Sequence, residues 1–167
     1  MSGGFLNRIP YVLVLLGGAG FAIGSYLTIA HWGDQPIACA GVGDCGYVNS
    51  SEYASIGGVP VSGLGSLLYL AMTLTALAWS RRSDVDWLPI AYWGQALAGA
   101  GYAAYLTYVE LWVLHAICVW CVTSAVLLTL SLVLASASVF MEPGEVDGEA
   151  VPATSDRLKR GAAPEPE

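Results

Sequence analysis

The four cysteines are the residues of this sequence whose type and spacing could do chemistry, and they form two close pairs. Cys118 and Cys121 make a C-x-x-C within the stretch HAICVWCVTSAV, and Cys39 and Cys45 are separated by five residues in a loop rich in Gly, Asp, Asn and Ser. An even number of cysteines in two close pairs predicts two disulfides. Thiol–disulfide exchange through a mixed disulfide could then pass electrons from one pair to the other.

Two other interpretations of these cysteines remain open. His115, Cys118 and Cys121 have the spacing of soft-metal ligands, and a loop cysteine could complete the site. Both pairs could instead be structural staples, although closing the short loop between Cys118 and Cys121 removes little chain entropy. Two thiols three residues apart share one face of a helix, and the first turn of a helix stabilises a thiolate. The pattern therefore favours redox chemistry, with no metal.

Long apolar segments must position these cysteines. Of the 167 residues, 56% are hydrophobic and 11% are charged, whereas about 25% are charged in a typical soluble chain. A helix needs about 20 mainly apolar residues to cross a bilayer, and four segments qualify: residues 9–30, 60–80, 87–109 and 115–140. These segments lack the polar face of helices in a soluble bundle. We therefore predict an all-α integral membrane protein, with residues 1–141 forming a four-transmembrane-helix bundle.

The six basic residues all predict one orientation of this bundle. Arg8, Arg81, Arg82 and the three basic residues of the C-terminal tail fall on one side of four spans, whereas the loop 31–59 holds no Lys or Arg. The positive-inside rule then places both termini in the cytoplasm and all four cysteines on the outer face. That side is oxidising in bacteria. We expect the first segment to be a retained helix, because it is longer than the apolar region of a signal peptide.

The outer loop, residues 31–59, is predicted to carry a short helix over residues 50–55. Asn49 and Glu52 have the spacing of a capping box, and Gly57-Gly58 is typical of a helix end. Residues 142–167 are acidic and contain several prolines, so we expect a disordered cytoplasmic tail there.

Four further residues near the cysteines are interpreted without a catalytic role. Glu110 is interpreted as a solvated turn residue, and Trp120 as part of an aromatic belt at the membrane interface. His31 and His115 could carry protons to an acceptor, but a solvated side chain at the interface is the simpler interpretation of each.

The order of these motifs resembles the vitamin K epoxide reductase family over roughly residues 10–140. The resemblance is carried by the loop pair Cys39-x5-Cys45, the later segments CGYVNSS and GVPVS, and the late AICVWC motif. It implies a four-helix bundle around a quinone, in which Cys121 lies beside the quinone and Cys118 exchanges with the loop pair. Ser51 matches the family's Ser or Thr six positions after the second loop cysteine, which implies a supporting role.

The function that this resemblance implies is a quinone-dependent thiol–disulfide oxidoreductase of the cell (inner) membrane. A separate, extracytoplasmic thioredoxin-fold (DsbA-like) protein would reduce the loop pair, and a quinone of the menaquinone or ubiquinone type would accept the electrons. The reoxidised partner would form disulfides in secreted proteins. Ala125 stands where the animal enzymes have a Tyr, which favours plain quinone reduction over epoxide reduction. We expect no nucleic-acid partner, and the alternative function is a soft-metal-binding membrane transporter or sensor.

Overall fold

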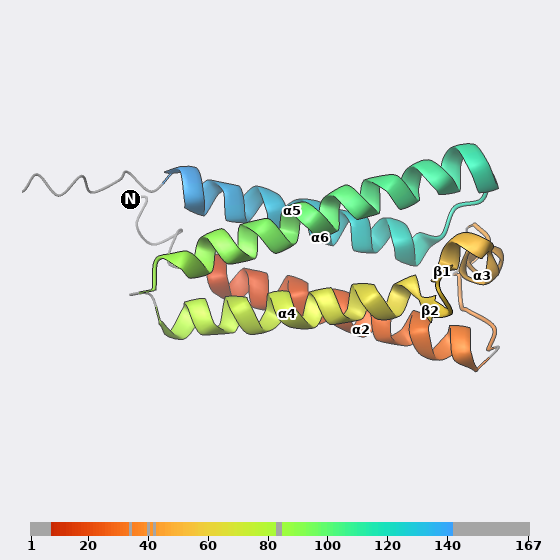
Figure 1. The fold of residues 1–167 in the computed structure, drawn as a ribbon, viewed down its shortest axis with the longest axis horizontal. Helices are drawn as coiled ribbons and strands as arrows, with labels where there is room; N and C mark the ends of the chain where they lie inside the picture. Colours follow the sequence, from red (N-terminus) through yellow and green to blue (C-terminus); the bar gives the residue numbers. More distant parts are fainter. Residues whose placement is uncertain (1–7, 34, 40, 42, 83–84, 142–167) are drawn as a thin grey trace, which may run out of the picture.

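Four long helices make up most of the computed structural model, which describes residues 8–33, 35–39, 41, 43–82 and 85–141. They are α2 (Ile9–Trp32), α4 (Val61–Arg81), α5 (Trp87–Tyr108) and α6 (Val119–Met141). The four lie side by side as an elongated bundle, and an outer segment covers one end (Figure 1). The predicted tail, residues 142–167, lies outside the described residues.

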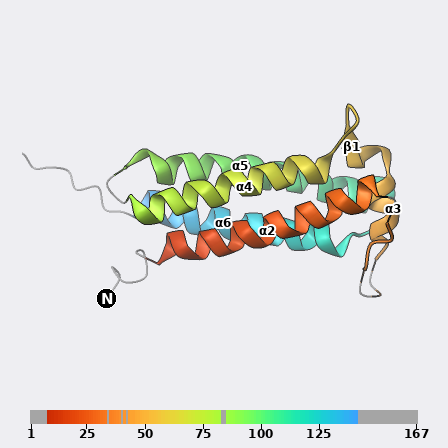
Figure 2. The ribbon, with the colours of Figure 1, turned by 90° about the horizontal axis from the view of Figure 1, so that it is seen from below.

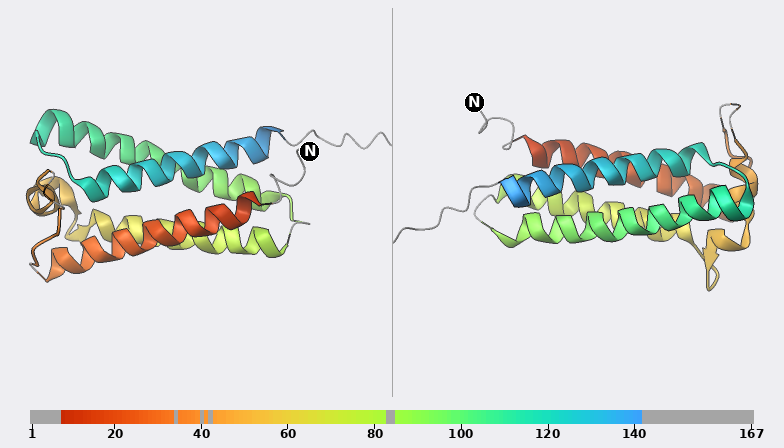
Figure 3. Two further views of the ribbon diagram at one scale, coloured as in Figure 1. Left: turned by 180° about the vertical axis from the view of Figure 1, so that it is seen from behind. Right: turned by 90° about the horizontal axis from the view of Figure 1, so that it is seen from above.

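The two ends of the bundle carry different residues. One end holds the start of α2, the end of α4, the start of α5 and the end of α6, whereas the outer segment lies at the opposite end (Figure 3). Arg8, Arg81 and Arg82 flank the first end. The described basic residues therefore lie away from the cysteines, as the sequence predicts.

Three of the long helices are long and apolar enough to cross a membrane. They are Ile9–Trp32, Val61–Arg81 and Val119–Phe140, with mean hydropathies of 1.9, 1.6 and 2.1. Their composition agrees with the prediction of a helical membrane protein. α5 has 22 residues and lies in the same bundle, and its crossing of a membrane stays a prediction.

Small residues bring α2 and α4 into close contact along their length (Figure 2). The ring of Tyr69 fills the space that a Cβ on Gly20 would need, and the Ser66 Oγ would lie 2.6 Å from a Cβ on Gly24. The Tyr69 hydroxyl donates to the Ser124 carbonyl of α6 at 2.8 Å, so one tyrosine joins three helices. The fully buried core around it includes Leu13, Met72, Tyr92, Ala96 and Ala135.

The outer segment between α2 and α4 contains two short helices and a hairpin. The elements are α3 (Cys45–Ser50), η1 (Glu52–Ala54), β1 (Ser55–Ile56) and β2 (Val59–Pro60), with β1 and β2 antiparallel. Gly57 and Gly58 connect the strands, with φ of 59° and 84°. Positive φ at both central residues of a two-residue turn suits the twist of a hairpin and favours glycine. The prediction that these glycines end a helix is therefore wrong.

Two short helices, α3 and η1, stand where the sequence predicts one over residues 50–55, and only η1 lies within that range. The first of them, α3, begins at Cys45. Asp44 caps it, because the Asp44 carboxylate accepts the Tyr47 N–H at 3.0 Å. Asp is among the preferred N-cap residues, and a helix that starts here places Asn49 inside it. The predicted capping box of Asn49 and Glu52 is wrong, since the sequence offers two possible caps and packing selects Asp44.

The connection between α5 and α6 also differs from the prediction. α5 continues into a π-helical segment, η2 (Val109–Leu114), which ends at His115 with a φ of 51°. Backbone turned to positive φ cannot continue a helix, so the chain between His115 and Cys118 is irregular. The last long helix therefore begins at Val119 instead of at residue 115.

Candidate functional site

Cys39 and Cys45 form a disulfide in the outer segment, with their Cα atoms 6.0 Å apart. Cys45 is fully buried at the start of α3, whereas Cys39 is half-buried. The Cys45 backbone N–H donates to the Cys39 sulfur at 3.0 Å. The structure thus contains the loop pairing that the sequence predicts, and it exposes one cysteine of the pair more than the other.

Cys118 and Cys121 stand at the beginning of α6. The Cys118 carbonyl accepts the Val122 N–H at 3.0 Å, so Cys118 precedes the first turn of the helix and Cys121 lies within it. Both are free thiols in this structure, where Cys118 is fully buried and Cys121 is half-buried. The second predicted disulfide is therefore open in this structure, and only one of its two cysteines lies within the helix.

The two cysteine pairs belong to one buried cluster at the outer end of the bundle. Cys45, Val48 and Cys118 form its centre, and Cys39 and Cys121 pack against it. The fold therefore brings together two motifs that lie far apart in the sequence. This proximity is what exchange between the pairs requires.

Three contacts hold the loop against the C-x-x-C segment. The Asp44 N–H donates to the Ile117 carbonyl at 3.1 Å, and the Trp120 indole N–H donates to the Ala38 carbonyl at 2.9 Å. Gly43, with φ of 77°, passes so close to Ile117 that a Cβ would collide with the Ile117 carbonyl oxygen. The loop backbone and the C-x-x-C backbone are therefore in direct contact.

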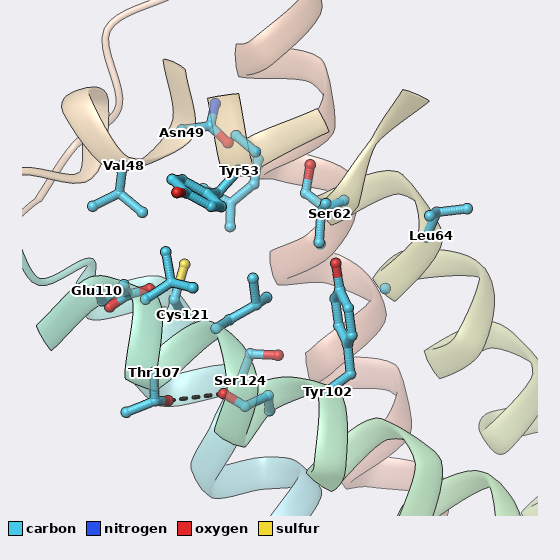
Figure 4. A pocket seen from close by; sticks show the side chains of 18 of the residues that line it. Val48, Asn49, Tyr53, Ser62, Leu64, Tyr102, Thr107, Glu110, Cys121 and Ser124 are labelled. Atoms are coloured by element: carbon cyan, nitrogen blue, oxygen red, sulfur yellow. Dashed lines mark hydrogen bonds between the residues drawn. The ribbon is translucent and has the colours of Figure 1, made fainter. Parts of the chain in front are cut away.

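A mainly apolar cavity of about 360 Å³ lies beside Cys121 (Figure 4). All four long helices and the outer segment contribute to its walls, which include Ile23, Leu27, Leu68 and Leu106. The Cys121 sulfur points into the space near Tyr53, and Tyr102 lies across from it. Other polar residues of the lining are Asn49, Ser51, Ser62, Tyr69, Thr107, Glu110 and Ser124. A cavity of this size with a few polar groups is typical of a site for a small organic molecule.

Ser51 lines the same cavity from the junction between α3 and η1. Its hydroxyl donates to the Val48 carbonyl at 2.8 Å, and Val48 belongs to the cysteine cluster. Ser51 thus touches both the cavity and the segment that carries Cys45. The position of Ser51 allows a supporting role, which stays a prediction.

Glu110 is buried in this site, so its interpretation as a solvated turn residue is wrong. Only 4% of the residue is exposed. Its Oε2 accepts the Cys118 N–H at 3.2 Å, and its side chain lines the cavity next to Cys121. Burial raises the pKa of Glu110, while hydrogen bonds from the Cys118 backbone and the Cys121 thiol oppose that rise.

The two histidines lie in different places. The His31 Nδ1 is 2.8 Å from the Asn49 carbonyl, which ties the end of α2 to α3. His115 is exposed and borders a separate open hollow with Asp44 and Tyr47. Within the described part of the chain, no three His, Cys, Asp or Glu side chains are arranged to hold a metal ion.

The fold and the site define a helical membrane protein with two cysteine pairs clustered at one end and an apolar cavity beside the second pair. A model of the vitamin K epoxide reductase family matches residues 11–136. The chain belongs to this family, which confirms the resemblance found in the sequence. Membership implies a membrane-embedded thiol–disulfide oxidoreductase.

Sequence reasoning misses two residues of the site, Glu110 and Trp120. Only Glu110 could have been recognised from the sequence. Glu110 is the single charged residue between Trp87 and Met141, and a lone acid within apolar sequence is by default a functional candidate. Trp120 resembles any interfacial tryptophan in the sequence. Its contact with Ala38 depends on how the loop folds back, which no local pattern encodes.

Proposed function

We propose that the chain is a quinone-dependent thiol–disulfide oxidoreductase that reoxidises a separate thioredoxin-fold protein on the outer side of the membrane. Electrons pass from the partner to the loop pair, then to Cys118 and Cys121, and finally to a membrane quinone. The reoxidised partner forms disulfides in secreted proteins. The observation that carries this proposal is the single cluster of both cysteine pairs, with Cys121 facing an apolar cavity.

The different burial of the two loop cysteines supports an order of exchange. The half-buried Cys39 is the accessible target for a partner thiolate, and attack there releases Cys45 as a thiolate. Cys45 lies in the cluster with Cys118, so it attacks Cys118 and releases Cys121 as a thiolate. The partner's second thiolate then frees Cys39, and Cys39 attacks Cys45, which restores the loop disulfide and releases Cys118. Cys118 and Cys121 take up the two protons that the partner's thiols lose. Each step exchanges one thiolate for another through a mixed disulfide. The electrons thereby arrive at the cysteine that lines the cavity.

The cavity beside Cys121 suits a quinone ring. Its aliphatic walls can pack against the ring, and the Tyr102 hydroxyl and the Asn49 amide are placed to bind a carbonyl oxygen. A quinone supplies an acceptor for two electrons and two protons. Cys121 delivers the electrons toward the cavity, and Cys118 closes the disulfide with Cys121. The outer segment covers the site, which limits the entry of water.

The membrane orientation belongs to the same proposal. α2, α4, α5 and α6 cross the bilayer, and the cysteines lie on the outer side. The positions of Arg8, Arg81 and Arg82 at the opposite end of the bundle support this orientation through the positive-inside rule.

The proposal is tested with purified protein in lipid nanodiscs, a reduced thioredoxin-fold protein as donor and a short-chain ubiquinone as acceptor. We expect one quinone reduced for each dithiol oxidised, followed by quinone absorbance and by thiol titration. Cys121→Ala should abolish the reaction, whereas Val122→Ala on the same helical turn should retain it. Quinone-dependent dithiol oxidation by Cys121→Ala contradicts the proposal.

A trapping experiment tests the relay itself. Cys121→Ser removes the thiol that resolves the bond at Cys118, so a disulfide between Cys45 and Cys118 should accumulate. Mass spectrometry of proteolytic peptides identifies it. Two isolated structural staples would give no such cross-link.

Stoichiometric zinc or copper bound through thiolates in the purified protein would instead support the metal-binding alternative.

A further inference from the structure

Glu110 is a buried carboxylate at the point where the C-x-x-C meets the cavity. It lies in η2, outside α5 and α6, and its Oε2 accepts the Cys118 N–H at 3.2 Å. The Cys121 thiol lies beside the same carboxyl group. Among the described residues that line the cavity, Glu110 is the only one with a carboxylate side chain. It therefore touches both reacting cysteines and the space that faces them.

Oxidation of two thiols to a disulfide releases two protons, and the apolar side chains of the cavity wall cannot accept them. Two S–H bonds break, one S–S bond forms, and two electrons and two protons leave the pair. The same two electrons and two protons convert a quinone into a hydroquinone. A group that accepts a proton from a thiol and gives it up inside the cavity would join the two halves of this reaction.

We infer that Glu110 is this group, taking the proton of the Cys121 thiol and passing it to the bound electron acceptor. This inference rests on the proposed function. Glu110 acts twice in each turnover, first for Cys121 and then for Cys118 as the disulfide closes. The carboxyl group ends the cycle in its starting protonation state. Two protons thus reach the acceptor with the two electrons.

The surroundings of Glu110 suit proton transfer. Burial favours the neutral form of a carboxyl group and brings its proton affinity closer to that needed near neutral pH. The titratable groups that face it are Cys118 and Cys121, and Tyr53 and Tyr102 line the same cavity from η1 and α5. His115 ends η2 and borders the other hollow.

A purely structural role for Glu110 is the competing explanation. Its carboxylate caps the irregular segment before α6 by accepting the Cys118 N–H, and such a cap contributes stability whether or not a proton moves. Glu110→Gln separates the two roles. The glutamine amide oxygen can accept the same N–H, but the amide cannot take up a proton at physiological pH.

The first test needs no quinone. Infrared difference spectra are recorded between the protein with Cys118 and Cys121 reduced by a water-soluble dithiol and the oxidised protein. We expect a change in the carbonyl band of a protonated carboxyl group in the wild type. The change should vanish in Glu110→Gln and persist in Glu52→Gln, whose carboxylate lies exposed in η1. A band change in Glu110→Gln as large as that of the wild type overturns the inference, and so does a wild type that shows no band change.

The second test uses turnover in nanodiscs. A positioned general acid or base contributes about 10²-fold to 10⁴-fold to a rate, so Glu110→Gln should lower kcat within this range and leave the KM for the quinone within threefold. Glu110→Asp keeps a carboxylate and should recover part of kcat. A kcat within threefold of the wild type in Glu110→Gln overturns the inference, and so does a loss confined to KM.

The two proposals can fail separately. If the wild type oxidises no dithiol with quinone, the proposed function fails, while the infrared test still decides whether Glu110 exchanges a proton with the cysteines. If the wild type is active and Glu110→Gln matches it, only the role of Glu110 fails. Should Glu110→Gln not fold, the infrared test is made with Glu110→Asp. We expect its carboxyl band to lie at a different frequency from that of the wild type. A band at the wild-type frequency would contradict the inference.

Discussion

The indole N–H of Trp120 donates to the backbone carbonyl of Ala38 at 2.9 Å, which joins the C-x-x-C motif to the residue before Cys39. The Trp120 ring also meets Tyr26 edge-on, with ring centroids 5.5 Å apart. Tyr26 in turn accepts the Ala38 N–H at 3.1 Å through its hydroxyl. These contacts hold the loop pair over the beginning of α6, where α2 supports both.

Trp120→Phe should slow exchange between the two cysteine pairs by about fivefold. The substitution keeps an aromatic ring beside Tyr26 but removes a hydrogen bond worth about 1 kcal/mol, so the loop is held less firmly over Cys118. Trp112→Phe is the matched control, because Trp112 is exposed on η2 and stacks only on Tyr108 among described aromatic rings. The rate of electron transfer from the loop pair to Cys118, measured by quenched-flow alkylation, should fall in the first variant alone.

Gly43→Ala should destabilise the site by about 1–3 kcal/mol more than Gly41→Ala does. Both glycines have φ of 77°, so both substitutions carry the cost of a left-handed alanine. A Cβ on Gly43 would also collide with the Ile117 carbonyl, whereas a Cβ on Gly41 meets no described atom within 4 Å. Denaturant unfolding in detergent measures the difference. Equal losses in the two variants would show that the loop does not rest on Ile117.

Ser51→Ala should weaken the binding of a quinone several-fold and cost about 1 kcal/mol of stability. The lost hydrogen bond from Ser51 to the Val48 carbonyl fixes the junction that lines the cavity. Ser50→Ala is the control, since the exposed Ser50 hydroxyl donates to the Tyr47 carbonyl away from the cavity. The KM for quinone is the measure of binding. An unchanged KM in Ser51→Ala would show that Ser51 has no role in quinone binding.

Stability should depend on pH through Glu110. Burial raises the pKa of Glu110 above its value in the unfolded chain, so the neutral carboxyl contributes stability. That contribution is complete below the unfolded pKa, about 4.3 for a glutamate, and it is lost as pH rises through the folded pKa. The wild type should therefore lose stability relative to Glu110→Gln as pH rises from about 4 toward 7.

Denaturant unfolding of both proteins across this range measures the effect. The histidines and tyrosines are common to the two proteins, so to first order their contributions cancel in the difference. A constant difference between the wild type and Glu110→Gln would show that the Glu110 carboxyl titrates alike in the folded and unfolded chains.

The long helices were predictable because continuous apolar sequence specifies them without reference to the rest of the chain. α2, α4 and α5 begin and end within two residues of the predicted spans, at Ile9–Trp32, Val61–Arg81 and Trp87–Tyr108. The start of α6 was not predictable from hydropathy. Residues 115–118 are apolar enough to belong to a helix, but His115 leaves helical geometry and Glu110 holds the Cys118 N–H from outside.

The outer segment shows a different limit. Asp44 and Asn49 can each cap a helix. A Gly-Gly pair is common at a helix end and also in a hairpin turn. Burial of Cys45 and Val48 against Cys118 decides between these alternatives. The cysteine pairs are visible in the sequence because their spacing is local, whereas Glu110 and Trp120 reach them only through tertiary contacts.

The π-helical segment η2 sets the rotational phase between α5 and the C-x-x-C. A single residue advances an α-helix by about 100°, so a segment with a wider turn directs the next part of the chain to a side that an uninterrupted α-helix would not reach. Removing one of residues 111–113, none of which lines the cavity, would therefore shift Cys118 relative to the carboxylate without altering any side chain of the cavity lining. The chain length of this connection is itself a determinant of which thiol meets which acid.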